Sequence, residues 1–276
     1  MTLLDQLRDA DRERHFATLF APAGKREALA ALALFEIDVA RVVERAREPA
    51  AGEIRLQWWR EALAGERGPE AAGNPIASAL LGAIARFKLP VAAFDRLLDA
   101  RVADLYHDPV PDRAALEALL GETRSVPLAL AAQILADGRD AGIADACGHG
   151  GVALGCVALL QSLARDRARG RVTVPLAMLA ATGSDAERFA SAQDAAEAAP
   201  AVAALVALAR EHFASFRSAA RPVPAALRPA LLPVAAAQAR LPALERAGGR
   251  LAIHSLRQPV LRPILAMARR AVMGWR

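Results

Sequence analysis

The sequence predicts an all-α fold in a single domain. Ala and Leu dominate its 276 residues, and aromatic residues make up only 4%. Ala and Leu lose little on entering a helix, whereas the residues that favour strands are in short supply. Apolar residues recur at steps of three or four, and no strand pattern alternates with the helical one. We therefore expect residues 1–276 to form one helical bundle around a buried core.

Five helices are expected before residue 110, and proline or glycine separates them. Pro22 and Gly24 mark the turn between the first two. Pro49 ends the second helix, because the residue before a proline avoids the helical conformation. A Gly- and Pro-rich loop is expected over 65–75, after the third helix. The expected ranges are 2–20, 25–47, 51–63, 76–87 and 91–107.

The second half of the chain shows the same periodicity. A helix over 112–136 contains Pro127, which predicts a kink because proline removes a backbone hydrogen bond and clashes with the preceding turn. A long apolar helix over 140–168 includes Gly148, Gly150, Gly151 and Gly155, which predict a close backbone approach or a break. Further helices are expected over 184–192, 199–219, 224–239 and 257–274.

The charge and the cysteines indicate which kinds of partner and which cellular compartment to expect. The net charge of +5 suits an anionic partner, but no nucleic-acid-binding motif accompanies it, so we expect none. Cys147 and Cys156 match no zinc pattern and are expected to be buried thiols in a reducing compartment. Neither a signal peptide nor an uncharged apolar run of about 18 residues is evident. We expect a cytoplasmic protein, or one peripheral to the inner face of the cytoplasmic membrane.

The C-terminal helix combines an apolar pattern with positive charge. Apolar residues recur at helical spacing from Leu256 to Trp275, and arginines lie among them: Arg257, Arg262, Arg269, Arg270 and Arg276. A basic amphipathic helix fits the surface of an anionic bilayer. Packing of the same helix on its own bundle explains the pattern equally well.

Three phrases carry a resemblance to a known family. They are FAPAGKREALAALALFEIDVARVVERA, EIRLQWWREAL and GCVALLQSLARDRARGRVTVP, of which RLQWWRE and RGRVTVP are the specific parts. In order and spacing they resemble the squalene/phytoene synthase family, which couples two isoprenyl diphosphates head to head. The resemblance implies an isoprenoid-synthase-like helical bundle with a central cavity.

The chemistry of that family requires magnesium ions held by two helices, each carrying acids at positions i and i+4. Aligned on the flanking phrases, the first pair falls on Ala40 and Glu44 and the second on Ser162 and Asp166. Each pair has lost its leading acid, and Arg165 stands where the family usually has Glu. Beyond these remnants we identify no catalytic residue, and we identify no set of metal ligands. Magnesium is expected only if Glu44 and Asp166 still bind a diphosphate.

This pattern of loss resembles the degenerate branch of the family that includes the mitochondrial complex I assembly factor. The resemblance implies a non-catalytic role in respiratory complex I assembly, with a subunit of the complex or another assembly factor as partner. Two alternatives remain open. One is an active head-to-head prenyl transferase with reorganised acids, and the other is a lipid-binding peripheral membrane protein.

Two groups of residues are candidates for ligand binding. Arg165, Arg169 and Arg171 surround Gly170, and guanidinium groups offer a planar donor fork to phosphate; a solvated basic turn is the competing interpretation. Trp58 and Trp59 are candidates to line a cavity for an isoprenoid or another lipid, although packing in the core explains at least one of them.

Overall fold

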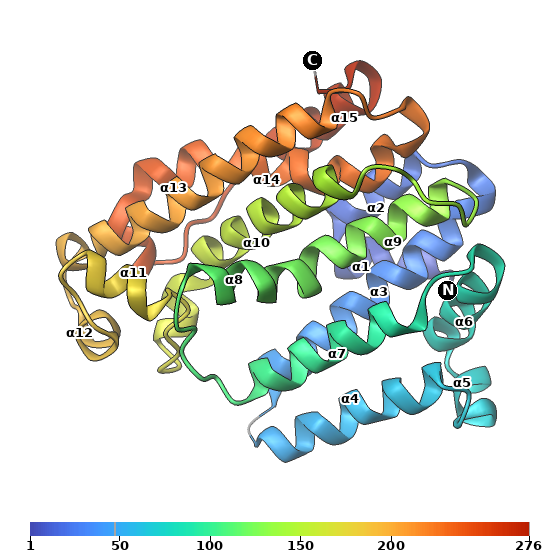
Figure 1. Ribbon diagram of the computed structural model, residues 1–276, viewed down its shortest axis with the longest axis horizontal. Coiled ribbons are helices and arrows are strands. Elements are labelled where there is room, and N and C mark those ends of the chain that lie inside the picture. Colours follow the sequence, from blue (N-terminus) through green and yellow to red (C-terminus); the bar gives the residue numbers. More distant parts are fainter. Residues whose placement is uncertain (47, 276) are drawn as a thin grey trace.

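The computed structural model describes residues 1–46 and 48–275, and these residues contain helices but no β-strand. The long helix α10 (Ala144–Arg167) runs through the middle of the bundle, with α13 and α14 on one side and α3 and α7 on the other (Figure 1). The helices before α10 are α1 (Leu3–Ala10), α2 (Arg12–Leu19), α3 (Ala23–Arg45), α4 (Pro49–Leu63), α5 (Gly68–Gly73), α6 (Pro75–Phe87), α7 (Val91–Leu105), α8 (Arg113–Leu120) and α9 (Val126–Leu135). Those after it are α11 (Leu176–Ala181), α12 (Ala186–Ser191), α13 (Ala195–Ala220), α14 (Arg228–Ala247) and α15 (Leu261–Met273).

The expected all-α bundle is confirmed, with local differences at the helix ends. The predicted helix over 2–20 is two helices, because the Asp11 side chain accepts hydrogen bonds from the backbone N–H groups of Glu13 and Arg14 and so caps α2. The predicted loop over 65–75 contains the short helix α5, and α11 was not expected. The predicted end of the second helix at residue 47 lies outside the described residues.

The predicted kink near Pro127 takes the form of a wide helical turn. Residues Gly121–Ser125 form a π-helical turn between α8 and α9, and Pro127 lies just after it, in the first turn of α9. At this turn the chain meets α10 at close range, since the Ser125 hydroxyl donates to the Gly148 carbonyl at 2.9 Å. A Cβ atom on Gly151 would collide with the Ser125 backbone. Gly150, Gly151 and Gly155 therefore serve close packing, and α10 continues unbroken through them.

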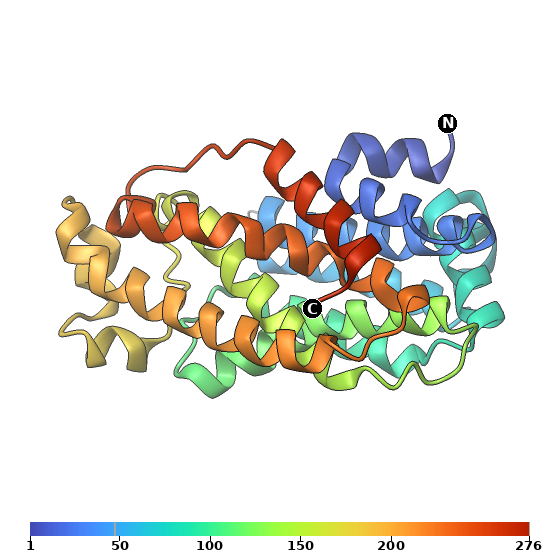
Figure 2. The same cartoon turned by 90° about the horizontal axis from the view of Figure 1, so that it is seen from above.

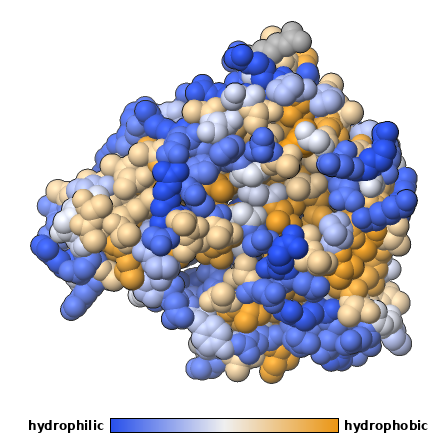
Figure 3. All heavy atoms as spheres, viewed as in Figure 1, coloured by the Kyte–Doolittle hydropathy of each residue, from blue (hydrophilic) through white to orange (hydrophobic). Residues whose placement is uncertain are grey.

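Only α10 meets the length and hydropathy expected of a membrane span, among the described residues. It packs against α13, α14 and the π-helical turn, and 61% of its most apolar 18-residue stretch is buried. Here α10 is the core helix of the bundle. The surface seen in Figure 3 mixes hydrophilic and hydrophobic residues, and the hydrophobic ones gather toward the right-hand end, where Figure 1 places α6.

Both cysteines are buried in α10 and are free thiols, as expected from the sequence. Burial raises the pKa of each thiol to about 12. Because the thiolate is the reactive form, we expect native protein at pH 8 to resist alkylation by iodoacetamide, and urea-unfolded protein to react at both sites. Mass spectrometry of the modified protein measures both rates, and rapid alkylation of the folded protein would contradict this placement.

Candidate functional site

The two degenerate motif positions come together at one cavity. Ala40 and Glu44 on α3 and Ser162 and Asp166 on α10 all line a space of about 230 Å³. Helices α7 and α8, the π-helical turn and the segment 171–173 complete its wall. The four aligned positions therefore lie on two helices in the wall of one cavity.

Arg165 lies between the two remaining motif acids. Its Nη2 is 3.5 Å from Glu44 Oε1, and its Nε is 3.7 Å from Asp166 Oδ1. Ser162 holds the leading position of the second motif pair, and its hydroxyl donates to the Leu159 carbonyl within the same helix. The site thus presents two carboxylates joined by a guanidinium in place of two pairs of free carboxylates.

The other arginines of the basic turn hold the C-terminal end of α3. Arg169 donates to the Glu44 carbonyl and Arg171 donates to the Val43 carbonyl, each at 3.3 Å. Cations at a helix C-terminus satisfy its last carbonyls and complement its dipole. Arg165 and Arg171 line the cavity, and partial burial lowers the pKa of Arg171. Their predicted role in phosphate binding stays a prediction.

Arg167, which lies between Arg165 and Arg169 in the sequence, has a different set of partners. Its guanidinium donates to the carbonyls of Phe189, Ala190 and Ala192 and to that of Ala252. It also stacks 5.2 Å from the centre of the Phe189 ring. Arg167 therefore fixes the C-terminal end of α12 and the turn after α14 to the end of α10.

Trp58 and Trp59 lie away from this cavity. Trp59 is buried, packs edge-on against Phe35 at 4.9 Å and donates to Asp38 at 2.8 Å. Trp58 donates to Glu70 at 3.0 Å. Both indoles line a surface depression with Asp38, which lies on the face of α3 opposite Ala40 by the helical repeat. Trp59 belongs to the core.

The cavity carries more charge than the motif positions alone. Asp104, His107 and Asp108, at the end of α7 and just after it, all line it. Burial and the nearby Arg171 lower the pKa of His107. Within 1–46 and 48–275, however, no three His, Cys, Asp or Glu side chains are grouped so that they can hold a metal ion. The donor set at the motif positions does not fit magnesium, since Arg165 occupies the space between the carboxylates.

Two cavity arginines were missed from the sequence. Arg101 on α7 and Arg124 in the π-helical turn both line the cavity. Arg101 had a detectable signal, because it falls on the buried line of α7 with Phe94, Leu97 and Leu105. A cation on an apolar helix face indicates a buried charge that requires partners.

This chain is similar to known proteins in both sequence and fold. Residues 7–264 match the profile of the squalene/phytoene synthase family. The chain is 26% identical over 243 residues to the NADH dehydrogenase (ubiquinone) complex I assembly factor 6 of Rattus norvegicus, covering 88% of this chain and 73% of that protein. The Homo sapiens protein of the same name is 26% identical over 229 residues, covering 83% and 68%.

Solved structures share the fold. A squalene synthase, HpnC from Alicyclobacillus acidocaldarius, superposes with a TM-score of 0.72 at 24% identity, covering 90% of this chain and 93% of that one. A dehydrosqualene synthase crystallised with a ligand superposes with a TM-score of 0.76 at 14% identity, covering 97% and 93%. These likenesses confirm the predicted isoprenoid-synthase-like bundle.

Proposed function

Because this chain belongs to the squalene/phytoene synthase family, we propose that it is a non-catalytic member that acts in the assembly of respiratory complex I. Relatives that align with most of its length are named as complex I assembly factors. The cavity is the one that the family fold implies. The charges of the residues that line it determine whether the magnesium-dependent chemistry of the family is possible.

The position of Arg165 between Glu44 and Asp166 is the observation that carries this proposal. Magnesium binds several oxygen ligands in octahedral geometry, whereas a guanidinium offers only donors and repels a divalent cation. The Arg165–Glu44 pair is about half exposed, so it adds little stability. Its importance lies in the sign of the charge that it places between the two acids.

An activity assay tests the loss of catalysis. Purified protein incubated with farnesyl or geranylgeranyl diphosphate, magnesium and NADPH is expected to form no head-to-head hydrocarbon product. Robust product formation that disappears in Asp166→Ala would overturn the non-catalytic assignment and support an active prenyl transferase.

A genetic experiment tests the assembly role. Membranes of a strain that lacks this protein are expected to lose NADH–quinone reductase activity and assembled complex I. Because the proposed role does not use the motif acids for catalysis, a Glu44→Gln, Asp166→Asn double variant is expected to restore both. Normal complex I in the deletion strain would rule out this role.

We further propose that α15 rests on the surface of an anionic bilayer, where assembly of a membrane complex takes place. Helix α15 packs on α14 and α2 at the edge of the bundle (Figure 2). Its outer face keeps apolar side chains exposed, and exposed arginines lie beside them. No Asp or Glu occurs in residues 246–276. The exposed apolar residues are Leu261, Leu265, Val272 and Met273.

Vesicle sedimentation tests this surface. Binding to phosphatidylglycerol-containing vesicles is expected to exceed binding to pure phosphatidylcholine vesicles and to weaken with added salt. Val272→Glu is expected to reduce binding severalfold, because it places a carboxylate in the apolar contact. Ile54→Glu is the matched control, since Ile54 on α4 is 73% exposed and Val272 is 76% exposed. Equal loss in both variants, or no loss in Val272→Glu, would contradict the role of α15.

A further inference from the structure

Two histidines meet across the contact between α10 and α13. His149 on α10 and His212 on α13 bring their Nδ1 atoms to 3.2 Å, with the ring centres 5.2 Å apart. The other ring nitrogen of His212, Nε2, is 3.1 Å from Glu117 Oε1 on α8. His212 is 7% exposed, whereas His149 is half-buried. One chain of hydrogen bonds therefore links α8, α13 and α10.

The ionisation of Glu117 fixes the protons along this chain. Partial burial favours the protonated acid, but hydrogen bonds from Arg113 and His212 outweigh it and lower the pKa of Glu117. An ionised carboxylate only accepts hydrogen bonds, so His212 Nε2 is the donor to it. In neutral His212 the Nδ1 atom is then an acceptor, and His149 Nδ1–H donates to it.

This chain accommodates one added proton but not two. When His212 is protonated, its Nδ1–H becomes the donor and neutral His149 accepts with Nδ1, so the contact between the rings is kept. When both rings are protonated, both Nδ1 atoms carry hydrogen and neither can accept. The hydrogen bond is then lost, and two cations lie in contact where water screens poorly. The two rings therefore titrate as a unit, and the second proton requires them to separate.

The charged groups around the two rings do not remove this repulsion. Arg113 on α8 donates to Glu117 at 2.6 Å and to both carboxylate oxygens of Glu211 on α13, at 2.6 and 2.9 Å. Glu211 lies within electrostatic range of both rings. Each acid is thus already shared with a cation, to which two imidazoliums would be added. The neighbouring side chains from the π-helical turn, α14 and α10 are uncharged: Ser125, Val234 and the buried thiol of Cys156.

The two rings lie beside a close packing contact. Gly150 follows His149 on α10 and faces Phe216, which lies one turn after His212 on α13. A Cβ atom on Gly150 would be only 2.9 Å from the Phe216 ring. Phe216 in turn packs edge-on against the buried Trp275, with ring centres 5.4 Å apart. Separation of the histidine rings therefore disturbs the packing of α13 on α10 and of Trp275 on α13.

We propose that His149, His212 and Glu117 form a proton-sensitive clasp, which holds α10 against α13 with at most one added proton and opens when both rings are protonated. Imidazole is the side chain that ordinarily changes charge between pH 5 and 8. The unfolded chain can protonate both rings without this repulsion, so it binds more protons than the closed clasp. The stability that the clasp supplies is therefore present near pH 8 and is lost as the pH falls toward 5. The clasp does not depend on the assembly role, because it is a property of the isolated protein.

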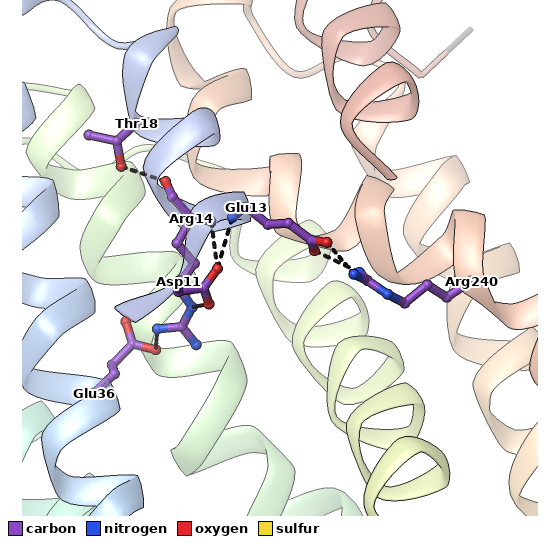
Figure 4. Close-up of polar contacts among 6 residues, drawn as sticks. All are labelled: Asp11, Glu13, Arg14, Thr18, Glu36 and Arg240. Atoms are coloured by element: carbon purple, nitrogen blue, oxygen red, sulfur yellow. Dashed lines mark hydrogen bonds and ion pairs between the residues drawn. The ribbon is translucent and has the colours of Figure 1, made fainter. Parts of the chain in front are cut away.

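A second cluster of buried charges, around α2, adds a background to any such pH dependence. Glu13 pairs with Arg240, and Glu36 pairs with Arg14 at 3.0 Å (Figure 4). Burial raises the pKa of Glu36. This cluster shares no residue with the clasp, so its titration is common to the wild-type protein and to variants of the clasp. Comparison of variants over one pH range therefore isolates the clasp.

Thermal unfolding at about pH 8 and about pH 5.5 tests the clasp. His149→Asn places an amide near the position of Nδ1, and an amide can donate to neutral His212 or accept from protonated His212. On acidification the melting temperature of the wild-type protein is expected to fall by at least about 3 °C more than that of His149→Asn. His254→Gln, at an exposed histidine, is the control and is expected to behave as the wild type. An equal fall in the wild type and His149→Asn would overturn the proposal.

Hydrogen–deuterium exchange with mass spectrometry locates the opening. After correction for the intrinsic pH dependence of exchange, peptides from the middle of α13 are expected to lose protection at the lower pH in the wild type but not in His149→Asn. Peptides from α6, which packs on α3 and α5, are the internal reference and are expected to keep theirs. Unchanged protection of α13 in the wild type, or equal loss in α6 and α13, would contradict the clasp.

Discussion

Replacing Gly151 by alanine is expected to lower the free energy of unfolding by about 3 kcal/mol, the upper end of the usual cost of overpacking. A Cβ at this position would lie well inside the van der Waals distance of the Oγ, Cα and N atoms of Ser125. Two of these atoms belong to the backbone of the π-helical turn, so a change of side-chain rotamer cannot relieve the collision. The turn or α10 must move apart along a buried contact. Urea unfolding followed by circular dichroism measures the loss.

Gly148 provides a control on the same helix. A Cβ there meets nothing within 4 Å. Because alanine is the better helix former, Gly148→Ala is expected to raise the free energy of unfolding by about 0.5–1 kcal/mol. Similar destabilisation in both variants would show that the effect does not come from contact with Ser125, and so would contradict the close packing of α10 on the π-helical turn.

The helices could be predicted wherever apolar periodicity and terminal signals agree. The expected ranges for α4, α6 and α7 lie within two residues of the observed helices, because proline marks a boundary of each. The six-residue helix α12 falls within its expected range of 184–192, whereas α5 and α11, which are equally short, were not expected. Their positions depend on contacts with neighbouring helices, which the local sequence does not encode.

The π-helical turn shows a different limit. Pro127 correctly indicated an irregular helix in this region, but the widened turn covers Gly121–Ser125, before the proline. Its backbone lies against Gly151 of α10, some 26 residues later in the chain. A proline can be seen in the sequence, whereas the helix against which the turn packs cannot. The glycines of α10 were visible, but their partner was not.

The candidate site was predictable in part because the family phrases fix the positions of its two helices. The four positions that these phrases indicate, Ala40, Glu44, Ser162 and Asp166, line one cavity. The ion-pair and hydrogen-bond partners of the charged residues were harder to predict. Asp166 lies beside Arg165, while Arg169 donates to the Glu44 carbonyl. Side-chain direction at a helix end depends on the neighbouring helix, here α3, and not on sequence spacing alone.

The same basic turn contains the side chain with the most acceptors in this region. Arg167→Met is expected to lower the free energy of unfolding by at least about 3 kcal/mol, since hydrogen bonds from a charged donor contribute about 1.5–3 kcal/mol each and do not add fully. The substitution leaves the carbonyls of Phe189, Ala190, Ala192 and Ala252 without this donor. Arg167→Lys is expected to recover only part of the loss, because an ammonium group cannot span several acceptors as a guanidinium does.

Arg169→Met is the matched control, two residues further along the same turn. Arg169 is exposed and makes one side-chain hydrogen bond, at 3.3 Å, among those identified in the described chain. Its replacement is expected to change the free energy of unfolding by less than about 0.5 kcal/mol. Limited proteolysis should also distinguish the variants, because loss of the Arg167 contacts releases the segment around 189–192 and exposes it to cleavage. If Arg167→Met unfolded at the same urea concentration as Arg169→Met, the anchoring role of Arg167 would be wrong.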